Sequence, residues 1–133
     1  MNRKLVKLLI AITSAFLCLT GCRRNTAEPI ILPTVDDICS INIELIDGRQ
    51  MSYENSESIK QIISAISIGK ATNKESVQDF PSEDEYGTIN IESNDGTTTV
   101  FYYVNSGKYF VEQPYQGIYE AVGNLENSLI NVK

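Results

Sequence analysis

The sequence predicts an α+β fold of two layers, in which a mainly antiparallel five-stranded sheet packs against two helices in the order ββαβββα. Three observations predict this class. Several short segments alternate between apolar and polar residues or are rich in β-branched and aromatic residues, as strands are. Turn sequences containing glycine separate them, and two other segments carry apolar residues at helical spacing. Meandering strands with a few helices are typical of a two-layer α+β domain.

The composition narrows the classes of function. The chain has 133 residues, a formal net charge of −6 and no histidine. Nucleic-acid binders normally present a basic surface, so we predict no nucleic-acid partner. The absence of histidine excludes Ser-His-Asp and Cys-His catalysis and histidine-containing zinc sites. The acidic stretch 79–85 lacks the spacing of a calcium loop. We therefore predict no metal, no cofactor and no catalytic residue.

The first 21 residues have the layout of a bacterial signal peptide. Arg3, Lys4 and Lys7 precede an apolar stretch from Leu8 to Leu19. As a helix this stretch spans about 18 Å, which is short of the ~30 Å hydrocarbon core of a membrane. Residues 1–21 are therefore predicted to be a signal peptide that is removed, and not a membrane span.

The end of that segment resembles the lipobox of bacterial lipoproteins. Leu19-Thr20-Gly21-Cys22 places an aliphatic residue and two small residues before a cysteine, whose thiolate can accept a lipid group. The resemblance implies cleavage between Gly21 and Cys22 and a diacylglyceryl group on Cys22. Two acyl chains hold a protein stably on a bilayer. We therefore expect membrane lipid as a partner and the extracytoplasmic face of the cell membrane as the location.

Residues 22–37 are predicted to be the lipidated N-terminus and a flexible linker, because they contain two prolines and no sustained periodicity. The apolar run Ile30-Ile31-Leu32 within them could dock on the domain. The folded α+β domain is then predicted to cover residues 38–133.

The first predicted strand alternates strictly from Cys39 to Leu45. Since Cys39 falls on its apolar face, we expect a buried and unreactive thiol there. A three-residue loop, Ile46-Asp47-Gly48, pairs Ile43 with Met51 and keeps one face apolar. We therefore predict a hairpin with Gly48 in the left-handed region.

A helix is predicted after Asn55, whose side chain can cap it. Gly69 is expected to end this helix, and the polar stretch 70–85 is predicted to be a long surface loop. The apolar residues of the helix follow the i, i+3, i+4, i+7 spacing and are Ile59, Ile62, Ile63 and Ile66.

Three further strands are predicted over 87–93, 97–104 and 108–112. If two-residue turns join them, Ile91 pairs with Val100 and Tyr102 pairs with Val111, which gives one apolar face. The opposite face then carries Phe101, Tyr103 and Phe110. If this face is bare, the three rings form an exposed patch and a candidate binding face. The alternative is that Ile30-Ile31-Leu32 or the second helix covers it.

The segment 114–119 is the most distinctive in the chain. Pro114 is expected to stop a strand, and Gly117 is expected to allow a tight start of the last helix. The helix is predicted from Ile118, Ala121, Val122, Leu125 and Leu129. A binding or a structural role is open for the motif residues, which are Pro114, Tyr115, Gly117 and Tyr119.

With the lipobox and the Asp-Gly hairpin, this motif resembles a family of small lipoproteins from Gram-positive bacteria that is known only as a domain of unknown function. The similar part runs from about Ile38 to Glu120 and contains the pattern Pro-Tyr-x-Gly-Ile-Tyr. The resemblance implies a bacterial cell-surface setting and no particular activity.

These observations lead to one expected function and two alternatives. We expect a lipid-anchored, non-enzymatic binding domain whose partner is a protein, a peptide or an envelope component. The first alternative is an immunity or inhibitor lipoprotein directed against a toxin or hydrolase. A carboxylate-dependent hydrolase ranks last, because no spacing selects a pair of acids.

Overall fold

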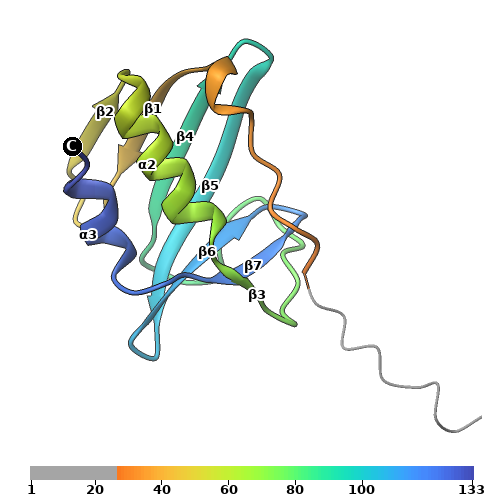
Figure 1. The fold of residues 1–133 in the computed structure, drawn as a ribbon. Helices are drawn as coiled ribbons and strands as arrows, with labels where there is room; N and C mark the ends of the chain where they lie inside the picture. The colour runs from red at the N-terminus through yellow and green to blue at the C-terminus, as the bar shows by residue number, and fades with distance from the viewer. Residues whose placement is uncertain (1–26) are drawn as a thin grey trace, which may run out of the picture.

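The structure, a computed structural model of the chain, describes residues 27–133. In this part of the chain a seven-stranded antiparallel sheet carries two α-helices on one face (Figure 1). The elements in chain order are η1 (Val35–Asp37), β1 (Ile38–Glu44), β2 (Gln50–Tyr53), α2 (Ser56–Ser67), β3 (Lys70–Ala71), β4 (Gly87–Ser93), β5 (Gly96–Asn105), β6 (Lys108–Gln113), β7 (Gly117–Glu120) and α3 (Leu125–Ile130). The predicted α+β class with an antiparallel sheet and two helices is confirmed.

The prediction of five strands is wrong, because the described residues contain two more. The sheet order is β2-β1-β4-β5-β6-β7-β3, and β3 and β7 form the end of it that the sequence did not predict. In β7, Ile118 pairs with Glu112 and Tyr119 pairs with Val111. Side chains at 118 and 119 are both buried although they point to opposite faces, since both faces are covered here. A helix would have placed them on neighbouring positions of one surface.

The prediction that the last helix includes Ile118, Ala121 and Val122 is therefore wrong, because α3 begins at Leu125. Gly123 has φ +67, a left-handed conformation that breaks any helix running through it. Asn124 then caps α3 through its side chain, which accepts a 2.9 Å hydrogen bond from the backbone of Asn127. The helix that remains buries Leu125 and Leu129.

The first hairpin follows the predicted register. Ile43 pairs with Met51 and Ile41 pairs with Tyr53. Gly48 has φ +84, and its N–H donates a 2.8 Å hydrogen bond to the carbonyl of Leu45. The three-residue loop and the left-handed glycine are confirmed.

Cys39 is exposed, and the prediction of a buried thiol is wrong. The register between β1 and β4 shifts between Ile38 and Ser40, which pair with Ser93 and Glu92. Cys39 is thus the extra residue of a β-bulge. The bulge turns Ile38 inward in its place, so Ile38 is buried and the thiol points to solvent.

The β5–β6 register is as predicted, with Tyr102 opposite Val111 and Val104 opposite Tyr109. The β4–β5 register is two residues away from the prediction: Ile91 pairs with Thr98, and Val100 pairs with Ile89. Asn94 and Asp95 form the turn. A shift of two leaves every side chain on its original face, so the apolar pattern does not detect it.

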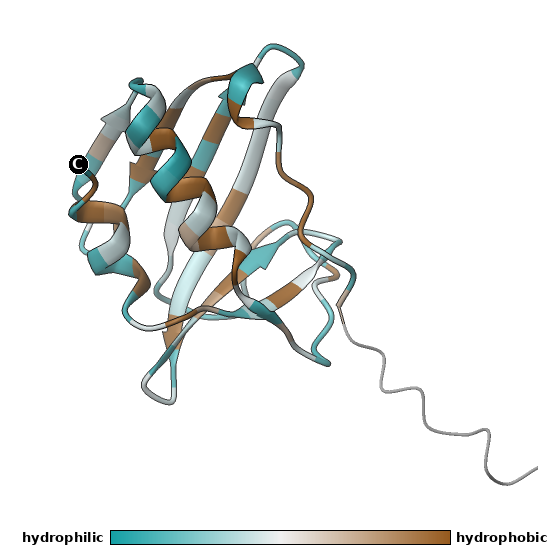
Figure 2. Cartoon of the chain, viewed as in Figure 1, coloured by the Kyte–Doolittle hydropathy of each residue, from teal (hydrophilic) through white to brown (hydrophobic). Residues whose placement is uncertain are grey.

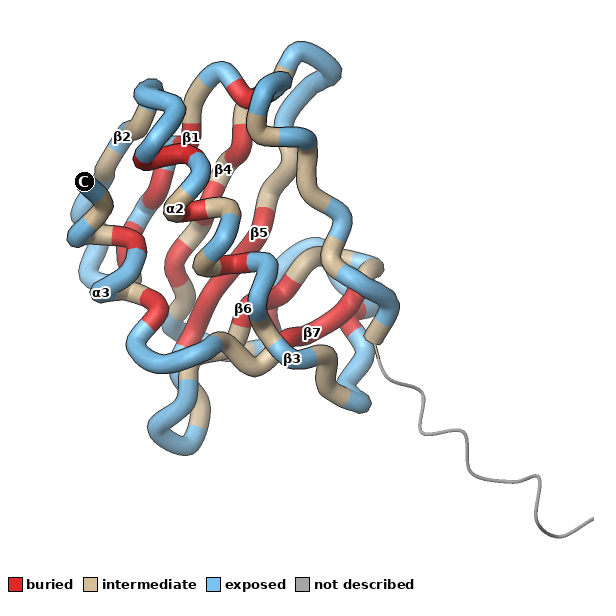
Figure 3. The backbone as a smooth tube through the Cα atoms, viewed as in Figure 1, coloured by how far each residue is buried: buried red, intermediate tan, exposed pale blue. Residues whose placement is uncertain are grey.

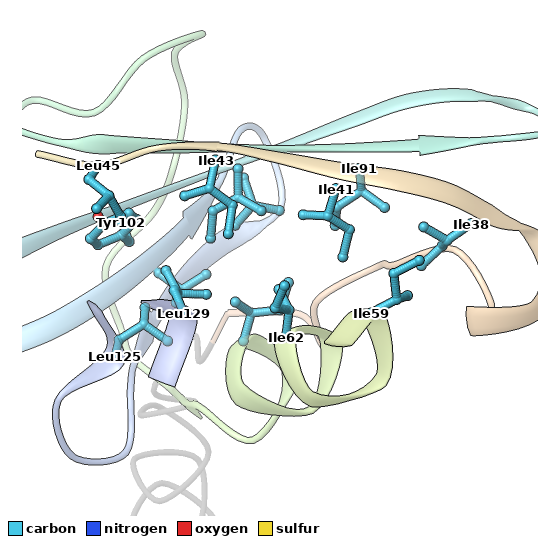
Figure 4. Packing of buried hydrophobic residues seen from close by; sticks show 14 of the residues in the cluster. Ile38, Ile41, Ile43, Leu45, Ile59, Ile62, Ile91, Tyr102, Leu125 and Leu129 are labelled. Carbon is cyan, nitrogen blue, oxygen red and sulfur yellow. The ribbon is translucent and has the colours of Figure 1, made fainter. Parts of the chain in front are cut away.

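The core lies between the sheet and the two helices, and the face of the sheet on this side is called the helix face. Ile59 and Ile62 of α2 and the two leucines of α3 point at Ile41, Ile43, Ile91 and Tyr102 of the sheet (Figure 4). Hydrophobic (brown) and hydrophilic (teal) segments alternate along α2, which lies over the sheet (Figure 2). As predicted, Asn55 caps α2 by accepting a 2.8 Å hydrogen bond from Ser58 N.

Two tyrosine hydroxyls attach α3 to the sheet. Tyr53 donates a 2.8 Å hydrogen bond to the carbonyl of Leu129, and Tyr102 donates a 2.9 Å hydrogen bond to Glu126 Oε2. Burial of the Tyr102 ring, together with the Glu126 carboxylate, raises the pKa of this phenol well above its ordinary value.

The chain from Ala27 to Asp37 lies against the domain. Ala27 N donates a 2.8 Å hydrogen bond to the carbonyl of Thr72, and the Tyr119 hydroxyl donates one to the carbonyl of Glu28. Gln116 Nε2 donates a 2.7 Å hydrogen bond to the carbonyl of Pro29. This part of the predicted linker is therefore a packed segment, whereas 22–26 lie outside the described residues. No helix in 27–133 is long and apolar enough to cross a membrane.

Candidate functional site

The candidate site lies on the side of the sheet opposite the helices, here called the loop face. The loop 72–86 crosses this face over β5, β6 and β7 (Figure 1). Phe101 of β5 lies between two aromatic side chains of the loop. Its ring centroid is 5.8 Å from that of Phe80 and 5.3 Å from that of Tyr86. Phe101 is 4% exposed as a result.

The three predicted aromatic residues do come together on the loop face. Tyr103 and Phe110 stack with ring centroids 5.9 Å apart, and Phe101 follows on the same side of β5. The face is not bare, because Phe101 and Tyr103 are buried. Figure 3 shows a red, buried stretch on β5. Neither Ile30-Ile31-Leu32 nor the second helix provides the cover. The loop that was predicted to be purely a polar surface loop provides it.

Four side-chain hydrogen bonds fix the loop to the strands beneath it and to the turn between β6 and β7. Near its start Thr72 Oγ1 donates to the carbonyl of Ile118 (2.8 Å), and in its middle Tyr115 OH donates to Asp79 Oδ1 (2.8 Å). The hydrogen bond to Asp79 raises the pKa of Tyr115. The other two bonds run from Asn105 Nδ2 to Glu83 Oε1 (2.8 Å) and from Ser76 Oγ to Glu112 Oε1 (2.6 Å).

Glu112 is the buried charged residue of this region, with 4% of its surface exposed. The buried polar or charged residues among 27–133 are Ser58, Ser76 and Glu112, and two of these three bond to each other. The ion pairs within the described part join Arg49 to Asp47 and Lys108 to Glu120. Among residues 27–133, Glu112 thus has a hydroxyl donor and no cationic partner within salt-bridge distance.

A cavity of about 270 Å³ lies between the loop and the strands, and Glu112 and Tyr103 line it. Burial raises the pKa of the Tyr103 phenol, and the neighbouring Glu112 carboxylate raises it further. The other lining residues are Lys74, Glu75, Val77, Gln78, Ser82, Glu83 and Ile118. Three carboxylates and one ammonium therefore surround this space.

Other hollows lie on the surface, but they lack a buried charge. One of about 590 Å³ between α2 and α3 is lined by exposed or half-buried residues. Another of about 330 Å³ lies on the open half of the loop face, near Asn42 and Glu44. Neither of these two hollows has a buried carboxylate in its lining, whereas Glu112 lines the cavity under the loop.

The motif 114–119 forms the β6–β7 hairpin and the surface on which the N-terminal segment packs. Pro114 follows the last residue of β6, as predicted, and Tyr115 takes a positive φ of 60° in the turn. Gly117 starts a strand rather than the predicted helix. A Cβ built on Gly117 would lie 2.3 Å from that of Ala27, so the close approach of this segment requires glycine.

The remaining predicted site residues, Gly21 and Cys22, lie outside the described residues. Within 27–133 no group of three or more acidic, cysteine or histidine side chains is arranged to hold a metal ion. Sequence reasoning missed Ser76, Glu83 and Glu112. A signal for Glu112 was available, because the predicted β5–β6 register already pairs it with Phe101 on the aromatic face.

The match to a protein family covers most of this arrangement. Residues 26–120 match DUF5301, a family described as "Domain of unknown function (DUF5300)". The chain belongs to this family. The DUF5301 match extends from the N-terminal segment to the end of β7, so it includes the loop and the cavity and excludes α3. The expected membership in a family of unknown function is confirmed, and Cys22 precedes the matched part.

A solved structure is similar to the DUF5301 domain of this chain. It is described as "NMR structure of the protein from Ruminococcus gnavus", with 52% sequence identity and a TM-score of 0.68. The similarity covers 74% of this chain and 97% of that chain. Nearly the whole relative therefore corresponds to about three quarters of this chain, which indicates that a part of this size folds by itself. No curated protein matches the chain.

Proposed function

We propose that the protein is a lipoprotein whose DUF5301 domain is a non-enzymatic binding module on the extracytoplasmic face of a bacterial cell membrane. A diacylglyceryl group on Cys22 holds it there, and its partner is a protein, a peptide or an envelope component. The binding site is the cavity under the loop 72–86. The observation that carries this assignment is the buried Glu112 carboxylate, which lines the cavity, accepts a hydrogen bond from Ser76 and lies beside the Tyr103 phenol.

A buried carboxylate costs folding free energy unless other groups compensate its charge. In a domain whose purpose is only to fold, an apolar residue at position 112 would pack between Phe101 and Ile118 without this cost. A few polar groups that converge on a hollow lined partly by apolar and aromatic side chains are typical of sites that recognise a ligand.

The start of the described chain supports a position close to the membrane. Ala27 follows Cys22 by five residues, which reach at most about 18 Å when fully extended. Ala27 is bonded to Thr72, the first residue of the loop over the cavity. A lipid on Cys22 would therefore hold the binding site within a few nanometres of the bilayer.

The immunity or inhibitor function is the second candidate, and an exposed apolar surface favours it. Val77, Phe80 and Tyr115 are 69%, 58% and 66% exposed and lie on the loop or bonded to it. Apolar surface of this kind is typical of contacts between proteins. For the third candidate, a carboxylate-dependent hydrolase, the supporting observation is that Glu83 and Glu112 line the same cavity.

The lipid anchor is tested in the full chain expressed in a Gram-positive host. Wild-type protein should incorporate a fatty-acid probe and sediment with membranes, whereas Cys22→Ala should accumulate as an unlabelled precursor. Cys39→Ala is the matched control and should be labelled normally. Labelling of Cys22→Ala would contradict the proposal.

The binding site is tested with isotopically labelled domain 27–133 and an extract of bacterial envelope. Backbone amide signals around Ser76, Tyr103 and Glu112 should shift, and Glu112→Gln should lose these shifts. Shifts confined to the exposed apolar residues would favour the inhibitor function instead. An extract that leaves every amide unshifted would contradict the binding module.

A further inference from the structure

The chemistry of the cavity under the loop defines the class of group that fits it. Of its lining residues, Glu75, Glu83 and Glu112 carry negative charge and Lys74 carries positive charge. Anions are therefore disfavoured there. A neutral ligand would leave the Glu112 charge without a cation, whereas a positively charged group would pair with it in a partly desolvated space, where ion pairs are strongest.

The aromatic wall adds a second reason for a cation. Tyr103 lines the cavity and stacks on Phe110. The Lys74 ammonium lies 5.5 Å from the centroid of the Phe110 ring, on this stacked pair. The chain's own ammonium group thus already makes the kind of contact that an organic cation makes with aromatic rings.

The volume sets the size of the group. A cavity of about 270 Å³ lies just below the range for small-molecule sites, which is roughly 300–1,000 Å³. It accommodates a short alkylammonium chain and not a large ligand. Among 27–133 no cluster suited to a metal ion lies here, so an organic cation is the better fit.

We propose that the cavity under the loop 72–86 binds an organic ammonium group, which pairs with Glu112 and packs its alkyl part against Tyr103. This inference rests on the proposed binding function and names its ligand class. The ammonium group belongs to a free amine or to a lysine-like side chain of a larger molecule. Lys74 competes for the aromatic pair and is displaced when the ligand binds.

The test uses labelled domain 27–133 and three probes. Nα-acetyl-lysine methylamide carries the ammonium group on an alkyl chain, and Nα-acetyl-norleucine methylamide has a similar apolar chain without the charge. Putrescine is a free amine. The lysine compound should produce saturable shifts of the amides of Ser76, Tyr103 and Glu112, and the norleucine compound should not. Shifts with putrescine as well would assign the site to free amines, and their absence would assign it to side chains.

Variants separate charge recognition from structural effects. Glu112→Gln should weaken binding of the lysine compound more than about tenfold. Glu44→Gln, a glutamate on the open half of the same face, should leave it unchanged, and Lys74→Ala should tighten it. Because Glu112→Gln could disturb the fold, its amide spectrum is compared with that of the wild type. The double variant Tyr103→Phe/Glu83→Gln provides a second test in which Glu112 is kept. This second variant should also bind more weakly.

Equal shifts with the lysine and norleucine compounds would overturn the proposal, as would weaker binding in Lys74→Ala. If all three probes fail while envelope extract still shifts the same amides, the ammonium assignment is wrong and the binding function stands. If both the probes and the extract fail, the binding function fails with it.

Discussion

Ser76 Oγ donates a 2.6 Å hydrogen bond to Glu112 Oε1 across 36 residues of sequence, and both residues are buried. This bond joins the loop 72–86 to strand β6. The bond compensates part of the free-energy cost of burying the Glu112 carboxylate beneath the loop. The loop is thereby a part of the folded domain rather than a connection that passes over it.

Replacement of Ser76 by alanine should lower the free energy of unfolding by about 1.5–3 kcal/mol, because the buried carboxylate loses a hydrogen bond to a charged group. Urea denaturation of the domain measures this. Ser52→Ala removes an exposed serine that bonds to Asn42 and should cost no more than about 0.5 kcal/mol. Equal losses of unfolding free energy in the two variants would show that the buried Ser76 bond contributes no more stability than an exposed one.

Truncation of Phe101 to alanine should cost about 3–5 kcal/mol of folding stability, since its buried ring fills the space between Phe80 and Tyr86. Phe80→Ala removes the exposed partner of the same contact and should cost much less. Thermal unfolding of the two variants compares them. A loss within about 0.5 kcal/mol for Phe101→Ala would mean that the loop leaves this face in solution.

Gly87 cannot carry a side chain without displacing the core. A Cβ there would lie 2.1 Å from Tyr102 Cε1 and 2.8 Å from the carbonyl oxygen of Glu44. Gly87→Ala should therefore cost about 3 kcal/mol or prevent folding. Gly48→Ala meets no atom within 4 Å but has φ +84, so about 1–2 kcal/mol is expected from backbone strain alone. Calorimetry should place Gly87→Ala well below Gly48→Ala in stability.

The thiol of Cys39 should react with an alkylating reagent in native domain 27–133 at nearly the rate seen in urea. The side chain is exposed on the bulge, and Cys39 is the cysteine that this part of the chain contains. Cys39→Ser should change the free energy of unfolding by less than about 0.5 kcal/mol. Strong protection from alkylation would indicate that the bulge is absent in solution.

Alkaline pH should destabilise the domain. Burial raises the pKa of Tyr102 and Tyr103 above the ordinary value of 10.0, so the unfolded chain releases these protons before the folded chain does. Their contribution to stability is complete below pH 10 and is lost as the pH rises above it. Denaturation followed by tyrosine absorbance measures this, and Tyr103→Phe should reduce the dependence on pH. A stability that rose above pH 10 would contradict the assignment.

Local patterns predicted the parts of the fold that local geometry decides. The apolar face fixed the β1–β2 and β5–β6 registers, and Asn55 marked the start of α2. The same reasoning failed at Cys39, because a bulge changes the face without changing the pattern. It also failed at Ile118 and Tyr119, whose spacing fits a helix as well as a strand covered on both faces.

The candidate site was predicted only in part for a different reason. The strand register brought Phe101, Tyr103 and Phe110 together, but their cover comes from a loop rich in polar residues. Ser76, Phe80 and Tyr86 act singly there and form no periodic pattern. Contacts between Ser76 and Glu112 or Asp79 and Tyr115 span 36 residues each, and a single sequence carries no local sign of them.

The packing of residues 27–31 against Thr72 and the β6–β7 hairpin has a mechanical consequence. A force applied to the chain before Ala27 acts first on the hydrogen bonds from Ala27 to Thr72, from Tyr119 to Glu28, from Gln116 to Pro29 and between Gln113 and Ile31. Strand β1 begins eleven residues later, at Ile38, and lies inside the sheet between β2 and β4. These peripheral hydrogen bonds must therefore break before the pulling force acts on β1. The N-terminal segment thus protects the core of the domain from forces applied to the chain before Ala27.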